Sequence, residues 1–171
     1  IVAEVVETTG ELHEVREQTV MATAAVGPAG LMSALQDERN WAAVELIGQS
    51  ETVTLRVSGY EETRRNTDDA IAGFERDVTE NGGAVAAAYG PALDGLAELQ
   101  ELRAQIDGYT GPRDLENTDF ADVIFNRYAD IIQPFNDGNT RLALVIDNKV
   151  LRTGVELIDV TSRQIETVAT L

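Results

Sequence analysis

The spacing of apolar residues between positions 51 and 80 constrains the fold more than any other feature of this sequence. One seam there runs in alternating steps of four and three through Val53, Val57, Tyr60, Arg64, Thr67, Ile71, Phe74 and Val78. Such spacing places the seam on one face of a helix that faces partner helices. No alternating strand pattern of useful length occurs in the chain. The pattern therefore predicts a long helix inside a helical bundle.

Glycine and proline positions divide the rest of the chain into further helical segments. We expect helices over about 2–26, 28–47, 51–80, 84–106, 118–146 and 149–171. The run Asn81-Gly82-Gly83 is a strong terminator, and Thr118 is suited to cap the helix that follows it. Gly90-Pro91 should weaken the segment 84–106, while Pro134 and Gly138 should bend or interrupt 118–146. We predict one all-α domain over 1–171, an elongated helical bundle of the four-helix-bundle type with long first and last helices.

Charge and residue usage exclude several classes of function. The 171 residues carry 30 acidic and 13 basic side chains, for a formal net charge of −17, which opposes nucleic-acid binding. There is no Cys, and His13 is the only histidine. Without a nucleophile–base pair, a metal triad or a glycine-rich phosphate loop, we expect no enzyme activity, no catalytic residue, no metal site and no cofactor. No stretch approaches the roughly 20 apolar residues of a membrane-spanning helix.

Arginines interrupt the apolar faces of three predicted helices. Arg39, Arg64 and Arg103 fall at positions that the helical period reserves for the core. A buried guanidinium must be paired, either with an internal carboxylate such as Glu38 or Asp68, or with a bound anion. Arginine suits a planar oxyanion because its rigid fork donates two parallel hydrogen bonds. Both alternatives are open at this point, and Thr67 would add a neutral hydroxyl donor one turn from Arg64.

Four motifs in these segments resemble a known family. Residues 35–39 (LQDER) resemble its LQxER element, and residues 63–70 (TRRNTDDA) resemble QRxxTDxA. Residues 96–107 are similar to its LxxLxxLRxxID stretch, and residues 128–132 follow its YxxII segment. The motifs occur in the family's order over about 31–135. The chain is therefore identified as resembling the NIT domain, the nitrate- and nitrite-sensing domain of bacterial transmembrane receptors.

The resemblance implies an all-helical sensor that binds nitrate, nitrite or a similar small oxyanion between its helices. Arg39 and Arg64 match the family's arginines, and the correspondence of Arg103 and Arg163 is weaker; Thr67 completes the candidate ligand-binding set. The resemblance further implies an extracytoplasmic part of a cell-membrane receptor, with a histidine kinase domain and spanning helices outside these residues. The chain is shorter than we expect of a complete family domain, which favours truncation at its C-terminal end.

A second class of function is compatible with the same residues. The domain would be a helical protein-interaction or dimerisation module without a small ligand, in which each arginine pairs with a carboxylate of the same domain. The net charge of −17 favours that alternative, because it repels anions. The direction in which Arg39 and Arg64 point should separate the two hypotheses. In either case we expect a parallel homodimer in the full receptor, formed mainly through the first helix.

Overall fold

The computed structural model describes residues 27–47, 53–113 and 118–146, and single positions from Arg152 to Arg163. Its helices are α2 (Gly27–Ile47), α3 (Val53–Asn81), α4 (Gly83–Gly95), α5 (Ala97–Asp107) and α6 (Asp119–Val145). All regular structure in these stretches is helical, which confirms the predicted all-α bundle. The predicted first helix and most of the last one lie outside the described residues.

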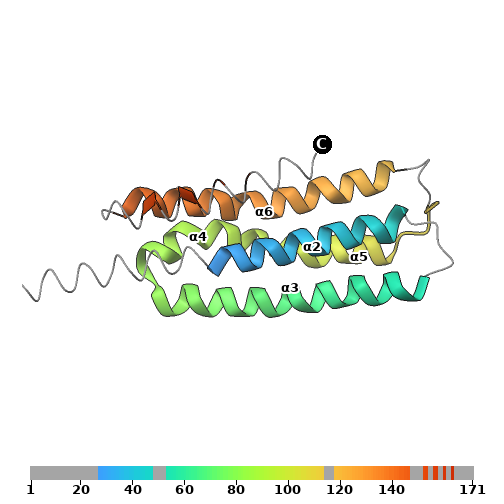
Figure 1. The fold of residues 1–171 in the computed structure, drawn as a ribbon, viewed down its shortest axis with the longest axis horizontal. Helices are drawn as coiled ribbons and strands as arrows, with labels where there is room; N and C mark the ends of the chain where they lie inside the picture. Colours follow the sequence, from blue (N-terminus) through green and yellow to red (C-terminus); the bar gives the residue numbers. More distant parts are fainter. Residues whose placement is uncertain are drawn as a thin grey trace, which may run out of the picture.

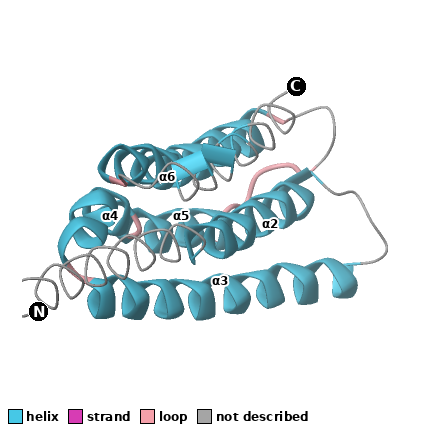
Figure 2. Ribbon diagram, turned by 60° about the vertical axis from the view of Figure 1, so that its left-hand side comes forward, coloured by secondary structure: helices cyan, strands magenta, loops and turns pink. Residues whose placement is uncertain are grey.

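The helices run lengthwise beside one another in an elongated bundle (Figure 1). In both views α3 and α6 lie on opposite sides, with α2 and the consecutive helices α4 and α5 between them (Figure 2). Thr67 of α3 reaches Ala34 of α2, and Tyr128 of α6 reaches Glu38 of α2. Residues distant in sequence therefore meet at the middle of α2, which packs against both α3 and α6.

The core follows the faces that the helical period predicts. The seam of α3 is buried at Tyr60, Thr67, Phe74 and Val78, while Arg64 is partly buried. Phe74 contacts two rings from other helices edge to face, Tyr89 of α4 at 5.2 Å and Phe135 of α6 at 5.7 Å between centroids. Burial of each large apolar side chain contributes about 1.5–3 kcal/mol, so these contacts hold α3, α4 and α6 together.

The turn between α3 and α4 depends on glycine. Gly82 and Gly83 have φ angles of 53° and 45°, in the region that side chains with a Cβ rarely adopt. The Gly82 N–H still donates to the Val78 carbonyl at 2.9 Å, which closes the last turn of α3. The predicted terminator is confirmed, and the chain reverses within one residue.

The predicted segment 84–106 divides into two helices, and the break differs from the expected one. The helix α4 continues through Pro91, and the chain breaks instead at Gly95 and Leu96. Pro91 and Ala87 are both exposed, so the Ala87 carbonyl that loses its helical donor faces water. Because the cost of the proline falls on the solvent side, the helix tolerates it.

Two local expectations concern α6. The helix runs without interruption through Pro134 and Gly138, so the interruption that was one of the two expected effects does not occur. Thr118 occupies the position before the first turn, yet its hydroxyl lies 3.2 Å from the Asp122 carboxylate and makes no capping bond to the backbone. Local propensity is overridden here because α6 packs along α2 and α4.

Candidate functional site

Arg103 of α5 and Glu38 of α2 form a buried two-point ion pair. The Nε of Arg103 donates to Glu38 Oε1 at 2.7 Å, and Nη2 donates to Oε2 at 2.8 Å. The Glu38 side chain is fully buried, and that of Arg103 is 7% exposed. Two parallel charge-assisted bonds fix both the distance and the plane of the partners. The pair therefore sets the position of α5 against α2.

A second carboxylate completes the surroundings of the Arg103 guanidinium. Its Nη1 donates to Asp68 Oδ1 at 2.7 Å, and its Nη2 also reaches the backbone carbonyl of Arg64 at 3.2 Å. Burial by itself lowers the pKa of Arg103, but the bonds and charges of Glu38 and then Asp68 outweigh it and raise that pKa above its ordinary value. Arg103 is thus a fixed cation that joins α2, α3 and α5.

Two tyrosines adjoin the Glu38 carboxylate. Tyr128 of α6 donates its hydroxyl proton to Glu38 Oε1 at 2.7 Å. Burial raises the pKa of Tyr128, and the negative charge of Glu38 raises it further. Burial also raises the pKa of Tyr60, and the neighbouring Tyr128 hydroxyl and then the Arg64 guanidinium only partly offset that rise. Both phenols therefore stay protonated at pH values at which exposed tyrosines ionise.

Arg64 of α3 reaches towards the end of α5. Its guanidinium pairs with Asp107 at 2.9 Å, and its Nη2 donates to the Arg103 carbonyl at 3.1 Å. The same group lies 4.3 Å from the centre of the Tyr60 ring. Burial lowers the pKa of Arg64, but its hydrogen bond to Asp107 and the contacts with Tyr60 and Asp107 raise it overall. Arg64 has a carboxylate partner within this fold.

Arg39 of α2 is the most deeply buried of these three arginines. It is 1% exposed, among the largest fully buried side chains among the described residues. Its guanidinium carbon lies 4.2 Å above the ring centre of Phe125 on α6. A desolvated arginine over an aromatic face is stabilised by the ring quadrupole. The sequence-based placement of Arg39 and Arg103 in the core is confirmed by their burial.

Thr67 lies between the arginine-bearing helices and is already engaged. It is fully buried, and its hydroxyl lies 3.2 Å from the Ala34 carbonyl of α2 and 3.0 Å from the Thr63 carbonyl one turn earlier. A single hydroxyl proton serves one of these carbonyls at a time. Thr67 therefore links α3 to α2 at the level of the arginines.

Arg163 lies apart from the other predicted residues. Its Nη2 is 3.1 Å from Thr140 Oγ1 and 3.5 Å from Asp137 Oδ1, both on the second half of α6. Twelve residues separate Phe125, beneath Arg39, from Asp137, about 18 Å along a helix. The structure therefore brings Arg39, Arg64, Thr67 and Arg103 into one region, with Arg163 in another.

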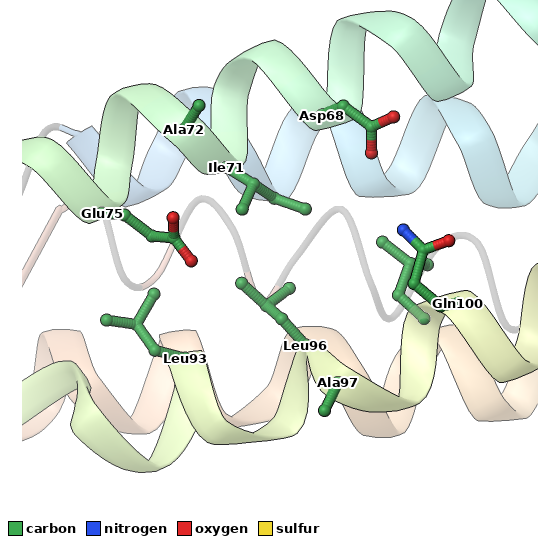
Figure 3. Close-up of a pocket in the computed structure, with 9 residues that line it drawn as sticks. Asp68, Ile71, Ala72, Glu75, Leu93, Leu96, Ala97 and Gln100 are labelled. Carbon is green, nitrogen blue, oxygen red and sulfur yellow. The ribbon is translucent and has the colours of Figure 1, made fainter.

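A pocket of about 400 Å³ opens between α3 and the junction of α4 with α5 (Figure 3). Ile71, Leu93 and Leu96 supply apolar walls, while the carboxylates of Asp68 and Glu75 lie along the α3 side. None of the described residues that line it is an arginine. Its charge is the wrong sign for a bare anion, so this pocket is not where the predicted oxyanion chemistry lies.

Several residues of the site were not singled out by sequence reasoning. Tyr128 lies in the core, and its hydroxyl bond to Glu38 does not follow from the sequence pattern. Phe125 was not considered. Asn136 and Asn139 of α6 are also fully buried polar residues. A polar residue on an apolar stripe is the signal that could have found the asparagines, as it found the arginines.

The fold and the site define an all-α bundle that buries Arg39 of α2 and Arg103 of α5, with Arg64 of α3 partly buried near them. The family model for nitrate and nitrite sensing, NIT, matches residues 30–162. The chain belongs to the NIT family and is a nitrate- and nitrite-sensing domain, which confirms the resemblance found in its motifs. Comparisons with curated proteins and with solved structures gave no match. None of the described helices is long and apolar enough to span a bilayer.

Proposed function

We propose that this domain senses nitrate or nitrite through Arg39, which supplies the principal cationic contact to the anion. The observation that carries the proposal is the full burial of Arg39 over Phe125, in a chain of the nitrate- and nitrite-sensing family. A dry site strengthens the attraction between a guanidinium and a weakly hydrated anion. The fork of the guanidinium also matches two oxygens of a planar oxyanion.

Arg64 and Arg103 support this site by fixing its helices. Arg64 pairs with Asp107, and Arg103 pairs with Glu38 and Asp68. We assign them the role of fixing α2, α3 and α5 around the anion, with Thr67 joining α3 to α2. Arg163 remains a predicted contact that only binding measurements on its variants can assign.

Signalling would follow from a shift between two packings of the helices. A ligand shifts an equilibrium between two conformations by the difference in its affinity for them. An anion held by Arg39 would therefore stabilise the helix packing in which the groups that bind it lie closest together. The full protein would be a transmembrane receptor, with this domain as its extracytoplasmic, non-catalytic input and a histidine kinase as its output. Two copies would associate in parallel through the first helix.

Calorimetric titration with nitrate, nitrite, chloride and sulfate tests the proposal. We expect selective binding of nitrate or nitrite, and a loss of at least about tenfold in affinity for Arg39→Gln, which keeps much of the side-chain volume but removes the charge. Arg76→Gln on the exposed part of α3 is the matched control. Absence of any selective oxyanion binding, or unchanged binding by Arg39→Gln, overturns it.

A second candidate is a dimerisation module without a small ligand. The ion pairs of Arg64 and Arg103 with carboxylates of the same domain favour this candidate. Sedimentation at increasing salt separates the candidates, because screening weakens the repulsion between two chains of charge −17. A dimer that forms equally with and without nitrate, in a domain that binds no oxyanion, supports this alternative.

A further inference from the structure

The pocket of about 400 Å³ between α3 and the junction of α4 with α5 has open apolar walls (Figure 3). Ile71 of α3 and Leu93 of α4 are only partly buried, although both pack against the hydrophobic core. The pocket follows the break in the chain at Gly95, where α4 ends just before α5 begins. Its volume lies within the range of about 300–1,000 Å³ in which proteins bind small organic ligands. The pocket is therefore large enough for an organic molecule with an apolar part.

Two carboxylates stand along the α3 side of this pocket, one on each side of Ile71 (Figure 3). Asp68 and Glu75 are seven residues apart, so they lie on the same face of α3, about 10 Å from each other along the helix. Leu96 lies across the pocket from Ile71. The pocket thus presents a negative end, an apolar middle and a second negative end.

Neither of these carboxylates is fully neutralised within the fold. Asp68 Oδ1 accepts a bond from Arg103 Nη1, but Arg103 also makes two bonds to Glu38, so these three side chains carry one excess negative charge. The Asp68 side chain is 54% exposed, which leaves it able to accept further bonds. Among the described residues, no basic side chain forms an ion pair with Glu75. Both ends of the pocket therefore favour a cation.

We propose that this pocket binds linear aliphatic diamines. One ammonium group binds Asp68, and the other binds Glu75. The methylene chain between them covers the apolar wall formed by Ile71, Leu93 and Leu96, where each methylene removed from water adds to the affinity. The proposal goes beyond nitrate and nitrite sensing, uses no arginine as a ligand and does not depend on the proposed anion site.

The lining of the pocket selects this class of ligand over other cations. A metal ion cannot bridge carboxylates about 10 Å apart, because its oxygen ligands lie within about 2.6 Å. A monoamine satisfies one carboxylate and leaves its apolar tail beside the other. An ammonium group has three donors, and the Gln100 carboxamide near Asp68 supplies an additional oxygen acceptor (Figure 3). The net charge of −17 also raises the local concentration of cations.

Calorimetric titration with three amines tests which length and charge of ligand the pocket takes. The probes are α,ω-diaminooctane, the shorter α,ω-diaminobutane, and octylamine, which has the longer chain with a single ammonium group. We expect diaminooctane to bind at least about threefold more tightly than either of the others, because only it reaches both carboxylates across the apolar wall. Equal affinities for diaminooctane and octylamine, or no binding of diaminooctane at millimolar concentration, overturn the proposal.

Two glutamate variants show whether the diamine binds in this pocket. Glu75→Gln removes one of the two charges at an exposed position of α3, and we expect it to weaken diaminooctane binding at least about threefold. The matched control is Glu62→Gln, an exposed glutamate of the same helix outside the pocket, which should change the affinity by less than about twofold. Equal losses would show a general attraction to an acidic chain and would overturn the proposal. Neither substitution alters Arg39, so the result is independent of the test of the proposed function.

Discussion

Glu38 and Arg103 lie 65 positions apart in the sequence and form a buried ion pair with two hydrogen bonds, at 2.7 and 2.8 Å. The pair joins α2 to α5. Its stabilising effect depends on both partners, because either one alone would be an uncompensated charge in the interior. Glu38 precedes Arg39 in α2, and Arg103 donates to the Arg64 carbonyl, so the ion pair adjoins the arginines of the proposed anion site.

Removal of Arg103 should be costly for folding. We expect Arg103→Ala to lower the free energy of unfolding by about 3–5 kcal/mol, since Glu38 is left buried with Tyr128 as its remaining partner. Urea denaturation of the variant and the original chain measures this change in the free energy of unfolding. The matched control is Arg127→Ala, whose side chain is more exposed and bonds Gln105 at 2.8 Å; its loss should stay within about 0.5 kcal/mol. Equal losses for the two variants would contradict the assigned burial of the pair.

The tyrosines predict a loss of stability at high pH. Their folded pKa values are raised, so the stability they contribute is complete below the ordinary value of 10.0 and falls as pH rises above it, where only the unfolded chain loses protons. A tyrosine that stays protonated in the folded chain contributes a slope of at most about 1.4 kcal/mol per pH unit, reached where the unfolded chain is fully ionised. Tyr128→Phe should reduce the slope between pH 10 and 11, where that ionisation is incomplete, by about 1 kcal/mol per pH unit. An unchanged slope in denaturant titrations would show that Tyr128 ionises in the folded state.

Two buried asparagines of α6 should respond in opposite directions to the same substitution. Both side-chain polar atoms of Asn136 are buried and have no hydrogen-bond partner among the described residues, so Asn136→Leu should raise the free energy of unfolding by about 1 kcal/mol. Asn139 accepts the Tyr89 hydroxyl at 2.6 Å, so Asn139→Leu should lower it by about 1–2 kcal/mol. Chemical denaturation of the two variants side by side checks the order. Equal effects would be inconsistent with the contacts described.

Gly138 marks a close approach between α6 and α4. A Cβ there would lie 2.4 Å from the ring of Tyr89, which is fully buried. We expect Gly138→Ala to cost about 1–3 kcal/mol through overpacking. Gly73→Ala in α3 meets nothing within 4 Å and should stabilise the helix by up to about 1 kcal/mol. Thermal melts of both variants test the packing, and a stabilised Gly138→Ala would disprove it.

Helix positions were predictable because they depend on local pattern. The limits of α2 and α3 fall within two residues of those expected. The run Asn81-Gly82-Gly83, for example, ends α3 through the backbone conformation of its own glycines, which is a local property. The break at Gly95 was not predictable in the same way. Whether a proline such as Pro91 ends a helix depends on which side of the bundle it faces, and that is a tertiary property.

The sequence by itself determined that arginines enter the core, because the 3–4 spacing leaves Arg39 and Arg103 no other face. It also offered Glu38 and Asp68 as candidate partners without choosing between pairing and anion binding. Only the packing of α5 near α2 and α3 decided that Arg103 takes both carboxylates, and only the packing of α6 on α2 decided that Arg39 covers Phe125. The physical reason is that periodicity fixes which face a side chain occupies, whereas its partner depends on the register and rotation of helices far away in the chain.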